Sequence, residues 1–260
     1  MNRREFIAFL TRNLLMASGL IPRSVIADNH ETPMQRHLEL FFAQLRYRGG
    51  DWLPRPFAVR PLMEEVMRRT SIEADTNRRV VTLTDPNLFA HPFLYMAGKF
   101  EFEPFSKEEA ENLRRFLSFG GLLLVDNALG QQGYGFDKSI RREMKKVFPD
   151  KELKRLPSSH AALRSYYLLK RIGGRKIVDS FLEGINVGDV TPVIYCHNDL
   201  GGAWERDQLG NWVYSCSPGG EEQRKDAFHL GINLILYAMT GNYKEDLIHV
   251  PFIRKRLTLG

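Results

Sequence analysis

Two polar clusters, each following an apolar run, contain the residue types that catalysis or ligand binding would need. In this chain of 260 residues, Asp126 and Asn127 end one run, and His197, Asn198 and Asp199 end another. Two carboxylates and an imidazole suit general acid–base chemistry, and they also suit a hard or borderline metal ion. In a purely structural interpretation, the aspartates cap the segments that follow them and the histidine packs under a loop. The sequence leaves both interpretations open.

Weaker candidates lie near these clusters. Trp204 and Arg206 belong to a charged stretch that predicts either a pocket wall or a partly exposed loop. The glycine-rich residues 130–135 match neither a dinucleotide fingerprint nor a P-loop, so we expect a flexible loop over the crevice. The candidate ligand-binding set is Asp126, Asn127, His197, Asn198, Asp199, Trp204 and Arg206. The sequence requires no cofactor and assigns no metal ligand.

The usual nucleophile motifs do not occur. The chain has neither a Gly-x-Ser-x-Gly elbow nor a His-Glu-x-x-His motif, which removes the simplest hydrolase and protease assignments. Cys196 lies inside an apolar run, where a thiol has neither the depressed pKa nor the exposure of a nucleophile. Cys196 and Cys216 fall on neighbouring predicted strands, so a disulfide and two buried thiols are both open.

A helix followed by a buried strand must position the first cluster. Ser106 to Glu109 forms a capping box, and the helix it starts should run to about Phe119. Residues 121–125 are continuously apolar, which is typical of a strand buried on both faces of a parallel sheet. Pro192–Cys196 is a second such strand. We therefore predict an α/β fold with a mostly parallel open sheet and helices on both faces, whose ligands collect beyond the strand ends.

The remaining segments are predicted with less detail. Strands are expected over 38–47, 80–83, 93–97 and 211–216, and helices over 57–70, 137–147 and 221–239. The strand over 211–216 is predicted from the alternation of Trp212, Tyr214 and Cys216. Asp137 is expected to cap the helix over 137–147. Residues 151–188 give no clear pattern. With no repeat and no linker, one α/β domain over 28–260 with an irregular C-terminal tail is the simplest organisation.

The N-terminus has the pattern of an export signal. Arg3 and Arg4 precede an acidic residue, Phe6 and Ile7, as in a twin-arginine signal, and residues 14–21 form a short apolar segment with small-residue cleavage after Ala27. An amphipathic helix in a cytosolic protein is the alternative. We expect residues 1–27 to be a signal peptide and the mature chain to be periplasmic or otherwise exported. No transmembrane helix is expected in that mature chain, since no run approaches about 20 apolar residues.

The net charge of +6 does not indicate nucleic-acid binding. Residues 1–27 hold four arginines against one acidic residue, so half of the excess charge belongs to the predicted signal. Other basic pairs, such as Arg78-Arg79, are interpreted as solvated helix faces, and no nucleic acid partner is expected. The composition, with 43% hydrophobic residues and two cysteines, excludes disordered chains and disulfide scaffolds.

Four stretches together resemble a known family. They are Arg46-Tyr47 with residues 49–52, residues 92–98, the helix–strand unit over 113–126, and Tyr195 to Trp204. This set resembles the bacterial domain of unknown function 4159 family over most of residues 36–245. The resemblance implies a three-layer, flavodoxin-like fold similar to class I glutamine amidotransferases and trehalose-utilisation-like proteins. It also implies an envelope context, in which relatives accompany MoxR-type ATPases and von Willebrand A-type proteins.

The resemblance argues against glutaminase activity. In amidotransferases the strand after a glycine-ended helix presents a nucleophilic cysteine, whereas the strand here ends in Asp126-Asn127. Residues 159–161 read Ser-His-Ala where relatives often carry Asp-His-Pro, which removes the support for a role of His160. We expect a non-catalytic ligand- or partner-binding module of the cell envelope. The alternative is a metal-assisted or acid–base hydrolase using Asp126, His197 and Asp199.

Overall fold

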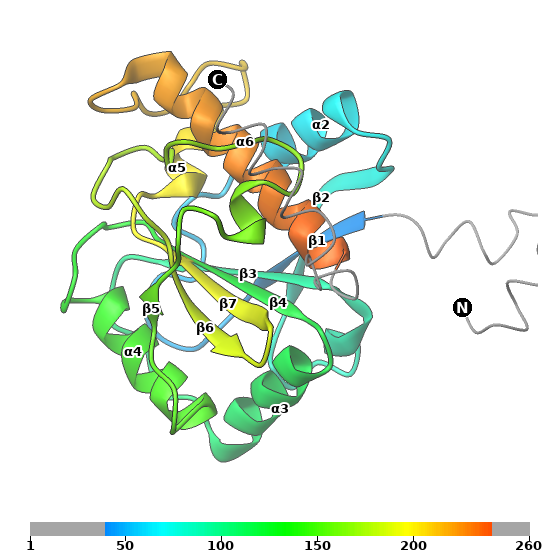
Figure 1. Ribbon diagram of the computed structural model, residues 1–260, viewed down its shortest axis with the longest axis vertical. Coiled ribbons are helices and arrows are strands. Elements are labelled where there is room, and N and C mark those ends of the chain that lie inside the picture. The colour runs from blue at the N-terminus through cyan, green and yellow to red at the C-terminus, as the bar shows by residue number, and fades with distance from the viewer. Residues whose placement is uncertain (1–39, 241–260) are drawn as a thin grey trace, which may run out of the picture. The chain divides into compact units, whose positions relative to one another are not determined.

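The computed structural model describes residues 40–240 of the chain (Figure 1). The predicted signal over residues 1–27 and the tail over 246–260 lie outside the described residues. The elements in chain order are β1 (Leu40–Leu45), α2 (Val59–Arg69), β2 (Ala74–Val81), η2 (Leu88–Ala90), β3 (Phe93–Gly98), α3 (Lys107–Ser118), β4 (Leu122–Asn127), α4 (Phe136–Val147), β5 (Lys154–Arg155), η3 (Ala161–Leu163), β6 (Glu183–Val187), β7 (Val190–Cys196), α5 (Leu200–Trp204) and α6 (Gly220–Met239). None of the helices in this part of the chain is long and apolar enough to cross a membrane.

The strands form one mostly parallel sheet. Its order is β2-β1-β3-β4-β7-β6-β5. The strands from β2 to β7 in that order pair in parallel, while β6 and β5 extend the sheet in antiparallel pairing. The parallel strands thus follow the 2-1-3-4-5 order of flavodoxin-like doubly wound sheets. The predicted α/β fold with a mostly parallel open sheet is confirmed.

Helices cover both faces of the sheet (Figure 1). Leu122 and Leu124 of β4 pack in one core with residues of α2, α5 and α6, and we call this side the α6 face. Leu123 and Val125 alternate to the other side, where they pack in a second core with α3 and α4, and we call this side the α4 face. The alternation along an uninterrupted apolar strand therefore produces the three-layer architecture.

One helix start matches its prediction and another does not. The Ser106 side chain accepts a hydrogen bond from the Glu109 backbone N–H at 3.1 Å, and the Glu109 carboxylate accepts one from the Ser106 N–H at 2.7 Å. The prediction that Asp137 caps α4 is wrong. Gly135, whose φ of 57° suits glycine, occupies the N-cap, while Asp137 lies within the first turn and pairs with Arg141 at 3.1 Å.

The strand predicted over residues 211–216 is also wrong. The backbone there makes only an isolated bridge between Arg206 and Trp212. The guanidinium groups of Arg206 and Arg224 lie 4.0 and 4.1 Å from the centre of the Trp212 ring. Cation–π contacts, rather than pairing with the sheet, hold this aromatic side chain. Conversely, the stretch without a clear pattern contains the short strands β5 and β6.

Candidate functional site

Asp126 lies at the carboxyl end of β4 on the α6 face and is fully buried. Its Oδ1 accepts a hydrogen bond from the Leu200 N–H at 2.8 Å. Its Oδ2 accepts from the Gly201 N–H at 2.8 Å and from the Tyr95 hydroxyl at 2.6 Å. Burial raises the pKa of Asp126 to about 6, and the nearby charge of Asp199 adds to the shift. Both oxygens of this carboxylate are therefore occupied by internal donors.

Asp199 forms a buried ion cluster at the start of α5. It adopts the left-handed conformation, with φ 56°, and its Oδ1 accepts a hydrogen bond from the Gly202 N–H at 3.0 Å. Arg55 binds the same carboxylate in a bidentate manner, with Nε 2.9 Å from Oδ1 and Nη2 2.5 Å from Oδ2. Arg175 also contacts Oδ2 through its Nε. The side chains of Asp199 and Arg55 are 1% and 4% exposed, so the pair is sealed from water.

The two glycines after Asp199 are required by these carboxylates. A Cβ at Gly201 would lie 2.8 Å from the Tyr95 hydroxyl oxygen, closer than atoms can pack. A Cβ at Gly202 would collide with the Asp199 carboxylate itself. The sequence Asp-Leu-Gly-Gly thus lets the start of α5 approach both aspartates closely enough for its N–H groups to bond them.

His197 lies on the opposite side of the sheet. Its Nε2 is 2.9 Å from the Glu183 carboxylate, and its ring packs 4.2 Å from the Tyr195 ring, which belongs to the core of the α4 face. Glu183 also binds Arg141 at 2.6 Å. The structure therefore brings Asp126 and Asp199 together but places the His197 imidazole on the other face, within a separate ionic network.

Asn127 and Asn198 organise the loops that follow their strands. The Asn127 Oδ1 accepts hydrogen bonds from the N–H groups of Leu129 and Gly130, at 3.2 and 2.9 Å. The Asn198 Oδ1 accepts two from the backbone of residues 178–179, at 2.8 and 2.9 Å. Both amides therefore shape loop backbones, and Asn127 fixes the start of the glycine-rich loop.

The remaining candidates have different environments. Trp204 is buried and donates its indole N–H to the Ala227 carbonyl at 3.0 Å, as a core residue would. Cys196 and Cys216 are free and buried, and burial raises the pKa of the Cys196 thiol. Among residues 40–240 no three His, Cys, Asp or Glu side chains come close enough to hold a metal ion. Arg206, in contrast, is exposed and lines a cavity.

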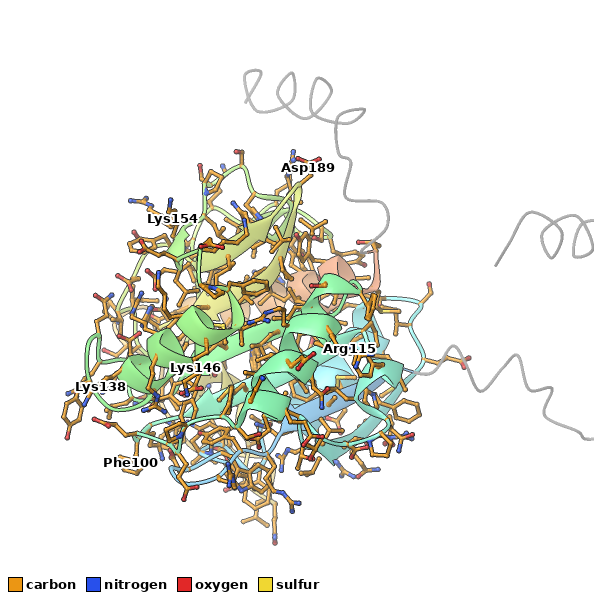
Figure 2. All side chains as sticks on the ribbon, turned by 90° about the horizontal axis from the view of Figure 1, so that it is seen from below. Phe100, Arg115, Lys138, Lys146, Lys154 and Asp189 are labelled. Carbon is orange, nitrogen blue, oxygen red and sulfur yellow. The ribbon has the colours of Figure 1, made fainter. Side chains whose placement is uncertain are left out.

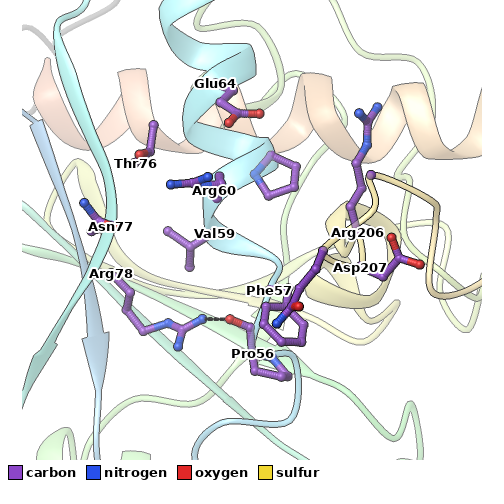
Figure 3. Close-up of a pocket in the computed structure, with 13 residues that line it drawn as sticks. Pro56, Phe57, Val59, Arg60, Glu64, Thr76, Asn77, Arg78, Arg206 and Asp207 are labelled. Carbon is purple, nitrogen blue, oxygen red and sulfur yellow. Dashed lines mark hydrogen bonds between the residues drawn. The ribbon is translucent and has the colours of Figure 1, made fainter.

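That cavity has a volume of about 440 Å³ and lies beside the start of α2 (Figure 3). Its walls come from residues within 56–64, 76–78 and 206–210, and we call it the α2 pocket. Of its lining, Arg206 alone belongs to the predicted ligand-binding set, although Asp207 lies in the same charged stretch of the sequence. The prediction that Arg78 and Arg79 lie on a solvated helix face is wrong, because both residues lie on strand β2 and Arg78 forms part of the pocket wall. No sequence motif marks the pocket, because three distant segments build it.

The buried ion cluster holds two walls of the α2 pocket in place. Arg55 precedes the wall residues Pro56 and Phe57, and Glu205 precedes Arg206. The Glu205 carboxylate, which is almost fully buried, accepts a hydrogen bond from the Phe57 N–H at 3.0 Å and so joins these two walls. Burial raises the pKa of Glu205. The polar residues at the strand ends therefore act on the pocket through the backbone.

Taken together, these features define a flavodoxin-like α/β domain with a buried carboxylate–arginine cluster and an open pocket at one edge of its sheet. The chain matches the family described as Domain of unknown function (DUF4159) over residues 41–239, and it belongs to that family. The matched span runs from β1 to the end of α6 and includes the cluster and the pocket. No curated protein matches the chain.

Proposed function

We propose that this protein is a non-catalytic binding module and that the α2 pocket is its ligand site. The main support is how the carboxylates at the strand ends are used. All oxygens of Asp126 and Asp199 accept hydrogen bonds from buried internal donors, so neither carboxylate is free to take a proton from a substrate. The α2 pocket, in contrast, is open, and its wall includes Arg78, whose buried Nε has no hydrogen-bond partner.

The positions of the candidate catalytic groups favour binding over hydrolysis. A general acid and a general base must both reach the reacting atoms, each lying about 2.6–3.2 Å from the heavy atom to or from which it transfers a proton. Asp126 and Asp199 lie on the α6 face, while His197 bonds Glu183 on the α4 face. A single substrate bond cannot meet all three groups in this arrangement.

A thermal-shift screen tests the proposal. The panel contains small aromatic and aliphatic compounds, each in neutral, cationic and anionic forms. At least one compound should raise the melting temperature of the wild type, because a ligand that binds the folded state stabilises it by mass action. The same compound should fail to stabilise Asn77→Trp, in which an indole fills the α2 pocket, and should still stabilise Lys151→Trp at an exposed position after α4.

The fate of the bound compound separates a binding module from an enzyme. Mass spectrometry after prolonged incubation should recover the compound unchanged. Conversion of the compound by the wild type, but not by Asp126→Asn or Asp199→Asn, would refute the non-catalytic proposal. A panel in which every stabilising compound also stabilises Asn77→Trp would refute the choice of pocket.

We also propose that the protein works outside the cytoplasm, exported by the twin-arginine route and in the company of envelope proteins. The support is the Arg3-Arg4 signal pattern, together with the envelope context that the family resemblance implies. Replacing Arg3-Arg4 with Lys-Lys should leave the chain in the cytoplasmic fraction. Unchanged export of that variant would remove the twin-arginine assignment.

A further inference from the structure

We infer that the ligand of the α2 pocket is an organic oxyanion, a phosphate or carboxylate carried on an apolar body. This inference rests on the proposed function, because it names the chemical class that the same pocket takes. It is carried by four observations: the unpaired arginines around the pocket, the burial of one of them, the uncapped helix that starts there, and the apolar part of the lining.

Three guanidinium groups border the α2 pocket. Arg78 belongs to β2, and the side chain of Arg60, on α2, lies on the same side of the pocket. Arg206 lies across the pocket from them (Figure 3). Within residues 40–240 none of these three forms an ion pair, whereas Arg55, beside the pocket, has Asp199. Two acidic residues also line the pocket. The Asp207 carboxylate accepts hydrogen bonds from Leu209 and Asn211, which belong to its own turn. Glu64 forms no ion pair with any of residues 40–240. The pocket therefore keeps an excess of unpaired positive charge.

Arg78 is the best placed of the three to hold an anion. Its Nη2 donates to the Pro56 carbonyl, and its Nε is buried without a hydrogen-bond partner. Burial lowers the pKa of this guanidinium, which means that the folded chain holds its charge at a cost. An oxyanion bound to the Arg78 guanidinium from the pocket would offset that cost, because its charged oxygen would accept a hydrogen bond in place of the water that burial removes.

The start of α2 adds to the positive potential. This helix has 11 residues, no side-chain cap at Ala58 and no acidic residue in its first turn. Val59 and Arg60, which begin the helix, both line the pocket. Free N–H groups at a helix N-terminus attract anions, and here they act together with the three arginines.

The rest of the lining is apolar, which sets the other half of the ligand. Phe57 is 48% exposed and lines the pocket together with Pro56 and Pro61. A pocket of about 440 Å³ falls within the size range of small-molecule sites. Inorganic phosphate alone would leave this apolar surface uncovered, so an anion with an aromatic or aliphatic body fits better.

Nuclear magnetic resonance titrations of the full-length protein test the inference. The probes are phenyl phosphate, benzoate, benzyl alcohol and inorganic phosphate, and the readout is the backbone amide shifts of residues 57–60, 76–78 and 206–210. Phenyl phosphate or benzoate should bind at least about tenfold more tightly than benzyl alcohol or inorganic phosphate, since a charge-assisted hydrogen bond is worth about that factor or more. The ratio between the two aromatic anions distinguishes a phosphate from a carboxylate site.

Variants of the three lining arginines make the test specific. Arg206→Gln and Arg60→Gln should each weaken the better anion about tenfold, and Arg78→Lys, which keeps the charge but loses the fork, should weaken it as well. Arg115→Gln is the matched control for Arg206→Gln. Like Arg206, Arg115 is exposed and lies over an aromatic ring, with its guanidinium 5.6 Å from the centre of the Phe89 ring. Arg115 belongs to α3, however, and does not line the α2 pocket (Figure 2). That variant should bind as the wild type does.

Three results would overturn the inference. Equal binding of benzyl alcohol and the anions would show an apolar pocket and would leave the proposed binding function intact. Equal weakening by Arg115→Gln would show general electrostatic attraction instead of a site. If no probe shifts the pocket amides while a cationic compound from the thermal screen does, the anionic class is wrong although the pocket is right.

Discussion

Replacing Arg55 with leucine should destabilise the protein strongly, because the buried Asp199 carboxylate then loses one of its two arginine partners and two of its hydrogen bonds. The Asp199 side chain is 1% exposed and would keep Arg175 and the Gly202 N–H as partners. Removing one member of a buried pair costs about 3–5 kcal/mol, and the retained Arg175 places the expectation near the lower end, at about 3 kcal/mol. For a domain of about 200 residues, each kcal/mol lowers the melting temperature by about 2–4 °C, so we expect a drop of about 6–12 °C.

Urea unfolding followed by circular dichroism measures this free energy. Arg48→Leu is the matched control, since Arg48 also pairs with carboxylates but its side chain is 62% exposed, and it should cost less than about 1 kcal/mol. Asp199→Asn keeps an acceptor for the N-cap and tolerates the left-handed backbone, so it supplies the second arm of a double-mutant cycle. The reasoning is refuted if Arg55→Leu costs no more than Arg48→Leu, or if the losses in Arg55→Leu/Asp199→Asn simply add.

Three further predictions concern the residues around this cluster. Burial raises the pKa of Asp126 from 3.8 to about 6, so between these pH values the folded chain binds more protons than the unfolded chain. The contribution of Asp126 to the free energy of unfolding therefore falls as the pH rises from about 4 to about 6. The stability of the wild type relative to Asp126→Asn should therefore decrease from pH 4 to pH 6.5 in urea titrations, and a constant difference would contradict it. Gly201→Ala should cost about 1–3 kcal/mol, since its Cβ would meet the Tyr95 hydroxyl at 2.8 Å, and an unchanged melting temperature would contradict the packing argument. His197→Gln should lower stability by loosening the contact with Glu183 and leave phenyl phosphate affinity within about twofold, because it lies on the other face; a large loss of affinity at unchanged stability would place His197 in the site.

Much of the layered fold could be predicted from local sequence. The continuous apolar run from Leu122 to Val125 indicates a strand that is buried on both faces, and the capping box at Ser106 gives the start of α3 within one residue. These signals are strong because each is complete within a few neighbouring residues. The antiparallel edge strands β5 and β6 lack such a signal, since β5 has two residues and β6 begins with a charged residue, Glu183, which pairs with Arg141 of α4.

The arrangement of the polar strand ends needed information that the sequence does not contain. In the sheet, Asp126 pairs in register with Cys196, so His197, one position further along, falls on the opposite face. A shift of one residue in that register would have placed His197 beside Asp126. The alternation of Trp212 and Tyr214 was misleading for a different reason, because arginine stacking produces the same pattern as a strand.

The adjacency of buried and exposed positions along the pocket walls has a consequence for how the family can diversify. Arg55 and Glu205 fix the backbone from inside, while their neighbours Phe57 and Arg206 face the cavity. Substitutions at the outward positions change the ligand without disturbing the inward ones, since the bond from the Phe57 N–H to the Glu205 carboxylate uses the backbone of Phe57 and not its side chain. One frame can therefore serve many specificities, and we expect paralogues to differ at the outward positions while they retain the inward pair.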